Sequence, residues 1–147
     1  MAPIKEWFGL YNVMYNWFEK KYGYKALNEY WSYITESCFD KVVEDFKKGG
    51  LESIKDYYEH TFRLDNGKCK AYLENEKLTI EVTKCPDYEF MKSSSNAHFV
   101  PIENYCKHHE VMNNILAEKS GHSFCMCECD NDGYCKWSFS KKGGVTG

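Results

Sequence analysis

The sequence predicts an α+β fold in which three N-terminal helices precede two β-hairpins that flank a fourth helix, in the order β-β-α-β-β. Apolar residues first recur with the 3.6-residue period of amphipathic helices, and from Cys69 onward they alternate with polar residues, as in strands. We expect one domain over 1–142, with a helical half (1–66), a half that holds an antiparallel sheet of about four strands (67–142) and a flexible tail (143–147).

Glycines separate three amphipathic stretches in the first half. The first helix is expected over about 3–22, because Gly23 follows its last periodic residue. The second is expected over about 25–48, where Gly49-Gly50 forms a clear stop, and the third over about 51–62.

Strict alternation predicts the first hairpin. A four-residue loop would pair Leu73 with Leu78, Ala71 with Ile80 and Cys69 with Val82 on one buried face. Cys85-Pro86 should end the second strand, because proline cannot donate to a ladder. Residues 87–101 are then expected to form either a mobile lid or a plain connector.

The fourth helix is expected over about 102–119. At 100° per residue, Cys106 and His109 fall on its apolar stripe and point inward side by side, whereas His108 lies near the edge of the stripe. A glycine at 121 ends this helix before the second hairpin.

The second hairpin is expected to turn at Asn131-Asp132-Gly133, a sequence that fits a type I turn with a glycine bulge. This turn would place Cys129 opposite Cys135, Cys127 opposite Trp137 and Cys125 opposite Phe139. The face that carries the thiols is then the buried one. We therefore expect Cys125 and Cys127 to pack in the core, as we do for Cys38 and Cys69.

Thiols and imidazoles concentrate in the second half, and they can bind transition metals or act as nucleophiles near neutral pH. The candidate site residues are Cys85, Cys106, His109 and Cys135, with Cys129 and His108 in reserve. No Cys-x-x-Cys pair is present. The spacing therefore leaves three interpretations open: thiols that pack as small hydrophobes, a metal site, or a nucleophilic cysteine.

Composition narrows the classes of partner. The net charge of −3 and a pI near 6.0 argue against nucleic acid. No run of about 18 apolar residues exists, so we expect no membrane span. No apolar leader opens the chain, which predicts a cytoplasmic location and reduced cysteines. The high aromatic content, 17%, fits a small-molecule cavity as well as ordinary packing, and a homo-oligomer is compatible with it.

Three short motifs follow the helical half: Thr83-Lys84-Cys85-Pro86, Tyr105-Cys106-x-His108-His109 and Gly133-x-Cys135-x-Trp137-x-Phe139. With these motifs the chain resembles the L-2-amino-thiazoline-4-carboxylic acid hydrolase-like family. The resemblance implies a hydrolase that opens a cyclic amidine C–N bond in a thiazoline amino acid. By motif, its site residues are Cys85, Cys106, His109 and Cys135. The thiol-rich strand 125–129 departs from the family pattern.

Two mechanisms fit such a site. In the first, Cys106 attacks the C=N carbon and His109 stabilises its thiolate, with no cofactor. In the second, the cysteines and His109 hold zinc, which activates water for the same attack. The alternative function is a non-catalytic small-molecule-binding or sensor domain with a Cys/His metal site, similar to 4-vinyl-reductase-like domains. The broad aromatic faces of the first two helices also fit a purely structural, partner-binding protein.

Overall fold

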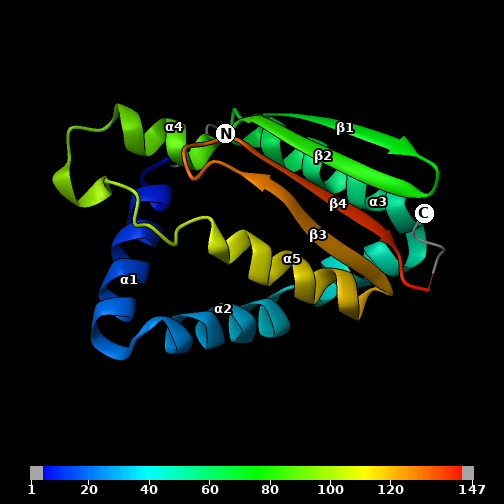
Figure 1. Ribbon diagram of the computed structural model, residues 1–147, viewed down its shortest axis with the longest axis horizontal. Helices are drawn as coiled ribbons and strands as arrows, with labels where there is room; N and C mark the ends of the chain where they lie inside the picture. The colour runs from blue at the N-terminus through cyan, green and yellow to red at the C-terminus, as the bar shows by residue number, and fades with distance from the viewer. Residues whose placement is uncertain (1–4, 144–147) are drawn as a thin grey trace.

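The computed structural model describes residues 5–143, and it confirms the α+β fold. Figure 1 shows three N-terminal helices, a four-stranded antiparallel sheet and two further helices. The elements in chain order are α1 (Glu6–Tyr22), α2 (Tyr24–Cys38), α3 (Asp40–Leu64), β1 (Lys68–Glu74), β2 (Lys77–Lys84), α4 (Pro86–Ser93), the 3₁₀ turn η1 (Ala97–Phe99), α5 (Lys107–Lys119), β3 (His122–Cys129) and β4 (Cys135–Lys141).

The helical half breaks at one place more than predicted. The expected helix over 25–48 is interrupted at Phe39, whose φ of −114° and ψ of 21° leave the helical region. The break expected at Gly49-Gly50 is present as a kink at Gly50 within α3, where the backbone angles are non-helical (φ 62°, ψ −149°). Cys38 is exposed as the last residue of α2, so its predicted place in the core is wrong.

The sheet has the strand order β1-β2-β4-β3. The first hairpin has the predicted register, with Leu73 opposite Leu78, Ala71 opposite Ile80 and Cys69 opposite Val82. Strand β2 ends at Lys84, as expected from Cys85-Pro86. Cys69 is half-buried and packs against the core.

The second hairpin corrects the predicted register. Cys129 opposes Cys135, as expected, but Met126 opposes Trp137 and Phe124 opposes Phe139. The register changes at a β-bulge, where Cys127 is one extra residue of β3 between Met126 and Glu128 and has no partner residue on β4. The larger apolar side chains of Phe124 and Met126 therefore pack inward, and Cys125 and Cys127 are exposed on the other face.

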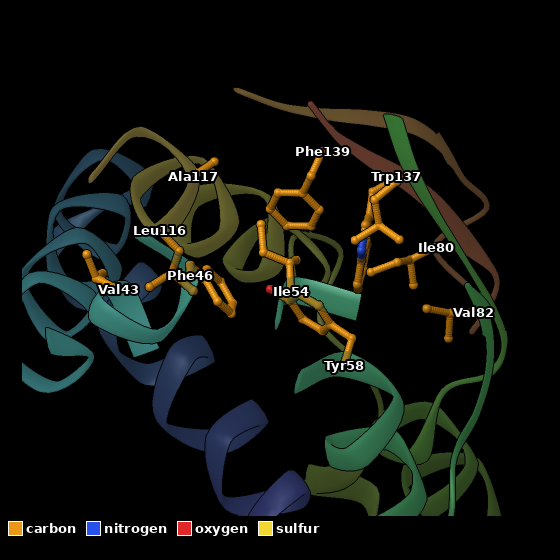
Figure 2. Close-up of a cluster of buried hydrophobic side chains, with 11 residues drawn as sticks. Val43, Phe46, Ile54, Tyr58, Ile80, Val82, Leu116, Ala117, Trp137 and Phe139 are labelled. Carbon is orange, nitrogen blue, oxygen red and sulfur yellow. The ribbon is translucent and has the colours of Figure 1, made fainter. Parts of the chain in front are cut away.

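One face of the sheet packs on α3 and α5 around a core of fully buried side chains (Figure 2). Its centre is Phe46, Ile54, Leu78, Ile80 and Phe139, each with no exposed surface. A second cluster joins α1, α2 and α4 around Trp31 and Tyr105. The Cys85 side chain packs against both clusters, so the candidate site lies where they meet.

The segment expected as a lid or connector is an ordered helix and a 3₁₀ turn. Helix α4 begins at Pro86 in its first turn, and its Tyr88 and Met91 are buried. The chain after η1 is tied to α1 by the buried Asn12, whose amide donates to the carbonyl oxygens of His98 and Val100 and accepts from the Ile102 N–H. The expectation of a loop over 87–101 is therefore wrong at Pro86–Ser93 and Ala97–Phe99, which are helical.

Within residues 5–143, no helix combines the length and apolar content needed to span a membrane.

Candidate functional site

The four residues predicted for the site line one narrow cavity. Cys85 follows β2, Cys106 precedes the first turn of α5, His109 lies within that turn, and Cys135 begins β4. The cavity measures about 10 Å³, close to the space for one water molecule. Segments far apart in the sequence thus bring these side chains to one place.

The predicted set does not, however, gather at ligand distance. Within residues 5–143, the three side chains that bring one ligand atom each to within 4.8 Å of one another are Asp87, His108 and His109. Only His109 belongs to both sets. The cysteines surround the cavity, and a tighter cluster of nitrogen and oxygen donors lies beside them.

His108 is the more buried histidine, with 5% of its surface exposed, and His109 is half-buried. The inward position predicted for His109 agrees with its place in the cavity wall, but His108, predicted near the edge of the stripe, is buried as well. The reason is that α5 packs against α2 on one side and β3 on the other, so that two of its faces are covered. His108 contacts Tyr15 and Trp31 of the helical half, and His109 contacts Trp137 of the sheet.

Asp87 occupies the first turn of α4, next to Pro86, and is 7% exposed. A carboxylate is favourable there because the helix N-terminus carries partial positive charge. The Tyr105 hydroxyl donates to Asp87 Oδ2 at 2.5 Å, and Tyr105 has no exposed surface. The carbonyl oxygen of Tyr105 lies in hydrogen-bond contact with Nδ1 of His108. Tyr105 therefore fixes both side chains.

Burial sets the charge states of this group. It raises the pKa of Asp87, an effect that His108 and the Tyr105 hydroxyl partly offset. Burial and the neighbouring His109 together lower the pKa of His108 to about 3, although Asp87 and the Tyr105 carbonyl raise it. Burial also lowers the pKa of His109 to about 4. Both imidazoles are thus neutral near pH 7. With Nδ1 of His108 donating to the carbonyl of Tyr105, Nε2 keeps a free lone pair.

The thiols around the cavity are protonated. Burial and the nearby Cys129 raise the pKa of Cys106 to about 12, although the hydrogen bond with the Tyr88 hydroxyl lowers it. Burial and Asp87 raise the pKa of Cys85 to about 12. Burial also raises the pKa of Cys135. Because the thiolate is the nucleophile, this environment does not activate Cys106.

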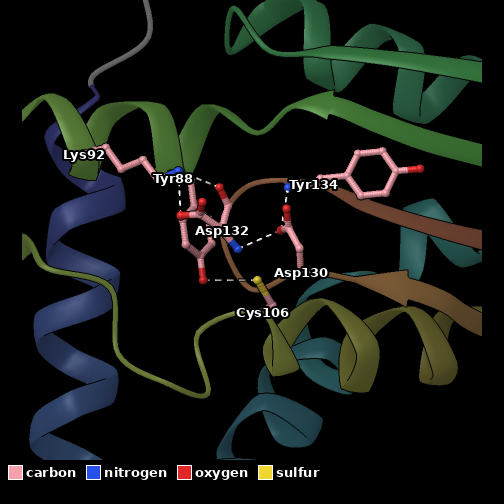
Figure 3. Close-up of polar contacts among 6 residues, drawn as sticks. All are labelled: Tyr88, Lys92, Cys106, Asp130, Asp132 and Tyr134. Atoms are coloured by element: carbon pink, nitrogen blue, oxygen red, sulfur yellow. Dashed lines mark hydrogen bonds and ion pairs between the residues drawn. The ribbon is translucent and has the colours of Figure 1, made fainter.

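The β3–β4 turn contributes Gly133 and Tyr134 to the cavity wall, and Figure 3 shows how Lys92 of α4 reaches this turn. Lys92 of α4 holds this turn, with its Nζ 2.6 Å from Asp132 Oδ1 and 2.7 Å from the Asp132 carbonyl oxygen. Gly133 lies so close to α4 that an added Cβ would be 3.3 Å from Cβ of Tyr88. Below the turn, the Cys106 thiol donates to the Tyr88 hydroxyl at 3.3 Å.

Sequence reasoning missed Asp87 and left His108 in reserve. The sequence analysis places Asp87 in a lid or connector, although Pro86-Asp87 directly after a strand is a typical first turn of a helix. The Pro86-Asp87 helix start places a carboxylate next to Cys85. It does not show that α5 packs near α4, which is what brings His108 and His109 beside Asp87.

Comparison with known proteins gives no relative: no family model, no curated protein and no solved structure matches this chain. The resemblance to the thiazoline hydrolase-like family stays a prediction from short motifs.

Proposed function

We propose that this protein binds a divalent transition-metal ion of the zinc class through Asp87, His108 and His109. The observation that carries the proposal is the approach of one carboxylate oxygen and two imidazole nitrogens to within 4.8 Å in a buried place. Zinc accepts these donors at about 2.0–2.2 Å, so a small closure of the three side chains gives a ligand set.

Charge supports the same conclusion. Asp87 is buried, and none of the ion pairs formed within residues 5–143 involves it. A buried carboxylate without a cation is unfavourable, because the protein interior solvates it less well than water does. A divalent ion beside two neutral imidazoles supplies that cation. The Tyr105 contacts would orient Asp87 and His108, as outer hydrogen bonds do for metal ligands.

Metal analysis tests this proposal. We expect the zinc-loaded protein to retain one equivalent after gel filtration, and Asp87→Asn and His109→Gln to lose it while circular dichroism shows them folded. His60→Gln is the matched control, because His60 is an exposed histidine on α3. Retention by both site variants, or no retained metal in the wild type, would overturn the proposal.

Cobalt substitution separates this ligand set from the thiol set predicted from the sequence. Nitrogen and oxygen ligands give Co(II) a spectrum without the intense thiolate charge-transfer band. A thiolate band that disappears in Cys106→Ser would instead assign the ion to Cys85, Cys106, His109 and Cys135.

A second candidate function is hydrolysis of a cyclic amidine C–N bond in the metal-water form. With three protein ligands, a bound ion would keep a fourth position for water, as catalytic zinc sites do, and the adjoining cavity has space for one water. The ion would supply an activated water near neutral pH. Tyr105 would position Asp87, while Cys106 and Tyr88 would line the path to the water. The raised pKa of Cys106 favours this form over attack by the thiol.

An assay for turnover of a thiazoline substrate distinguishes this enzyme from the alternative function, a non-catalytic sensor domain. We expect the metal-loaded protein to open 2-aminothiazoline-4-carboxylate, to lose this activity with a chelator and to keep part of it in Cys106→Ser. Bound metal without turnover would favour a non-catalytic small-molecule sensor. A small-molecule partner and a cytoplasmic location belong to both versions of the proposal.

A further inference from the structure

A pair of thiols lies on the face of the sheet that points away from the cavity and from helices α3 and α5. Cys125 and Cys127 are both exposed, and their Sγ atoms are 3.9 Å apart. The cross-strand partner of Cys125 is Ser138, whose neighbours Trp137 and Phe139 point into the core. The Cys125–Cys127 pair therefore has no part in the candidate metal site.

The β-bulge is the reason for this proximity. Residues i and i+2 on one face of a regular strand lie about 6.5–7 Å apart, too far for their sulfurs to meet. Here Cys127 is the extra residue between Met126 and Glu128, and the local bend turns its thiol toward Cys125. The Cys127 thiol lies 3.7 Å from the Cys125 carbonyl oxygen and 3.7 Å from Ser138 Oγ.

Two exposed thiols in contact can be oxidised together. The sulfurs need to approach by roughly 1.9 Å to reach the S–S distance of about 2.05 Å, which side-chain rotation at an exposed site can supply. Cys38 is the other exposed cysteine among residues 5–143, and it lies on α2, outside the sheet. The Cys125–Cys127 pair thus differs from a single surface thiol in having a resolving partner.

We propose that Cys125 and Cys127 are a redox-active dithiol, which a low-molecular-weight disulfide such as glutathione disulfide converts to an intramolecular disulfide. One cysteine, as its thiolate, attacks a glutathione sulfur, forms a mixed disulfide and releases one glutathione. The second thiolate attacks the protein sulfur of that bond and releases the other. Two electrons pass to the oxidant, and the two thiol protons leave on the two glutathione molecules.

The disulfide is expected to be reversible. Its ring spans three residues, so it restricts the unfolded chain little and adds little stability. Exposed and strained disulfides have the more oxidising potentials and are readily reduced. Burial and the Cys127 contact raise the pKa of Cys125, although Lys77 lowers it, so we expect a small thiolate fraction and slow exchange near neutral pH.

The test is to treat the folded, reduced protein with excess glutathione disulfide, alkylate the remaining thiols and fragment the tryptic peptide 120–136. We expect Cys125 and Cys127 to escape alkylation together, with no fragment ions from cleavage between them, and dithiothreitol to restore both. Cys125→Ser and Cys127→Ser should each instead hold one glutathione on the remaining thiol. Glutathione on Cys38 shows that the oxidant worked.

The proposal is overturned if Cys38 is modified while Cys125 and Cys127 stay reduced or carry separate glutathiones. It is also overturned if the disulfide forms between other cysteines, such as Cys129 and Cys135. None of these outcomes depends on bound metal, so they leave the proposal for Asp87, His108 and His109 to its own test.

Discussion

Replacing Tyr105 with Phe removes one buried hydroxyl and leaves the ring, so it isolates the hydrogen bond to Asp87. Tyr105 has no exposed surface and Asp87 is 7% exposed, so water cannot replace the lost donor. A hydrogen bond to a charged group contributes about 1.5–3 kcal/mol. We therefore expect Tyr105→Phe to destabilise the metal-free protein by about 2 kcal/mol, and to lower Tm by about 4–8 °C.

Urea unfolding of the metal-free protein at neutral pH measures this loss, with an unchanged m-value showing that the fold is kept. Tyr33→Phe is the matched control, because Tyr33 is 70% exposed. Tyr105→Phe should also weaken zinc binding about 10–100-fold, since the Tyr105 hydroxyl orients Asp87, whereas the contact of His108 with the Tyr105 backbone carbonyl is kept. If Tyr105→Phe unfolds within about 0.5 kcal/mol of Tyr33→Phe, the network that positions Asp87 is not as we describe it.

Three further predictions concern the fold. Asn12→Ala removes three hydrogen bonds at a 1% exposed residue, so we expect a loss of about 2–4 kcal/mol in urea unfolding and faster hydrogen exchange at the Ile102 amide. Ile80→Ala should cost about 2–5 kcal/mol by the same assay, because Ile80 has no exposed surface at the centre of the sheet. Burial and Lys141 lower the pKa of His122 below its unfolded value, so stability should fall as pH drops through about 6.5, and His122→Gln should reduce that dependence in urea unfolding.

The fold was predictable from the sequence where a single pattern, such as the alternation of apolar and polar residues, determines which side chains are buried. The register of β1 and β2 follows from alternation, because shifting it by one residue would expose Ile80 and Val82. The second hairpin offers apolar side chains on both faces of β3, so alternation does not choose between them. Phe124 and Met126 are larger than Cys125 and bury more apolar surface when they face the core. A bulge after Met126 lets these residues face inward while Cys129 still pairs with Cys135.

The site was predictable only in part, because its geometry depends on how elements pack. Cys85, Cys106, His109 and Cys135, which the sequence singles out, line one cavity, and their chemical roles stay a prediction. Periodicity could not show that α5 is covered on two sides, which buries His108, or that α4 brings Asp87 beside it.

X-ray absorption of the zinc-loaded protein tests the central claim most directly, because it measures the distances from the ion to its ligands. We predict nitrogen and oxygen neighbours at about 2.0–2.1 Å with the scattering pattern of two imidazoles, reduced to one in His109→Gln. Sulfur neighbours at about 2.3 Å, or a spectrum that His109→Gln leaves unchanged, would contradict the assignment of the ion to Asp87, His108 and His109.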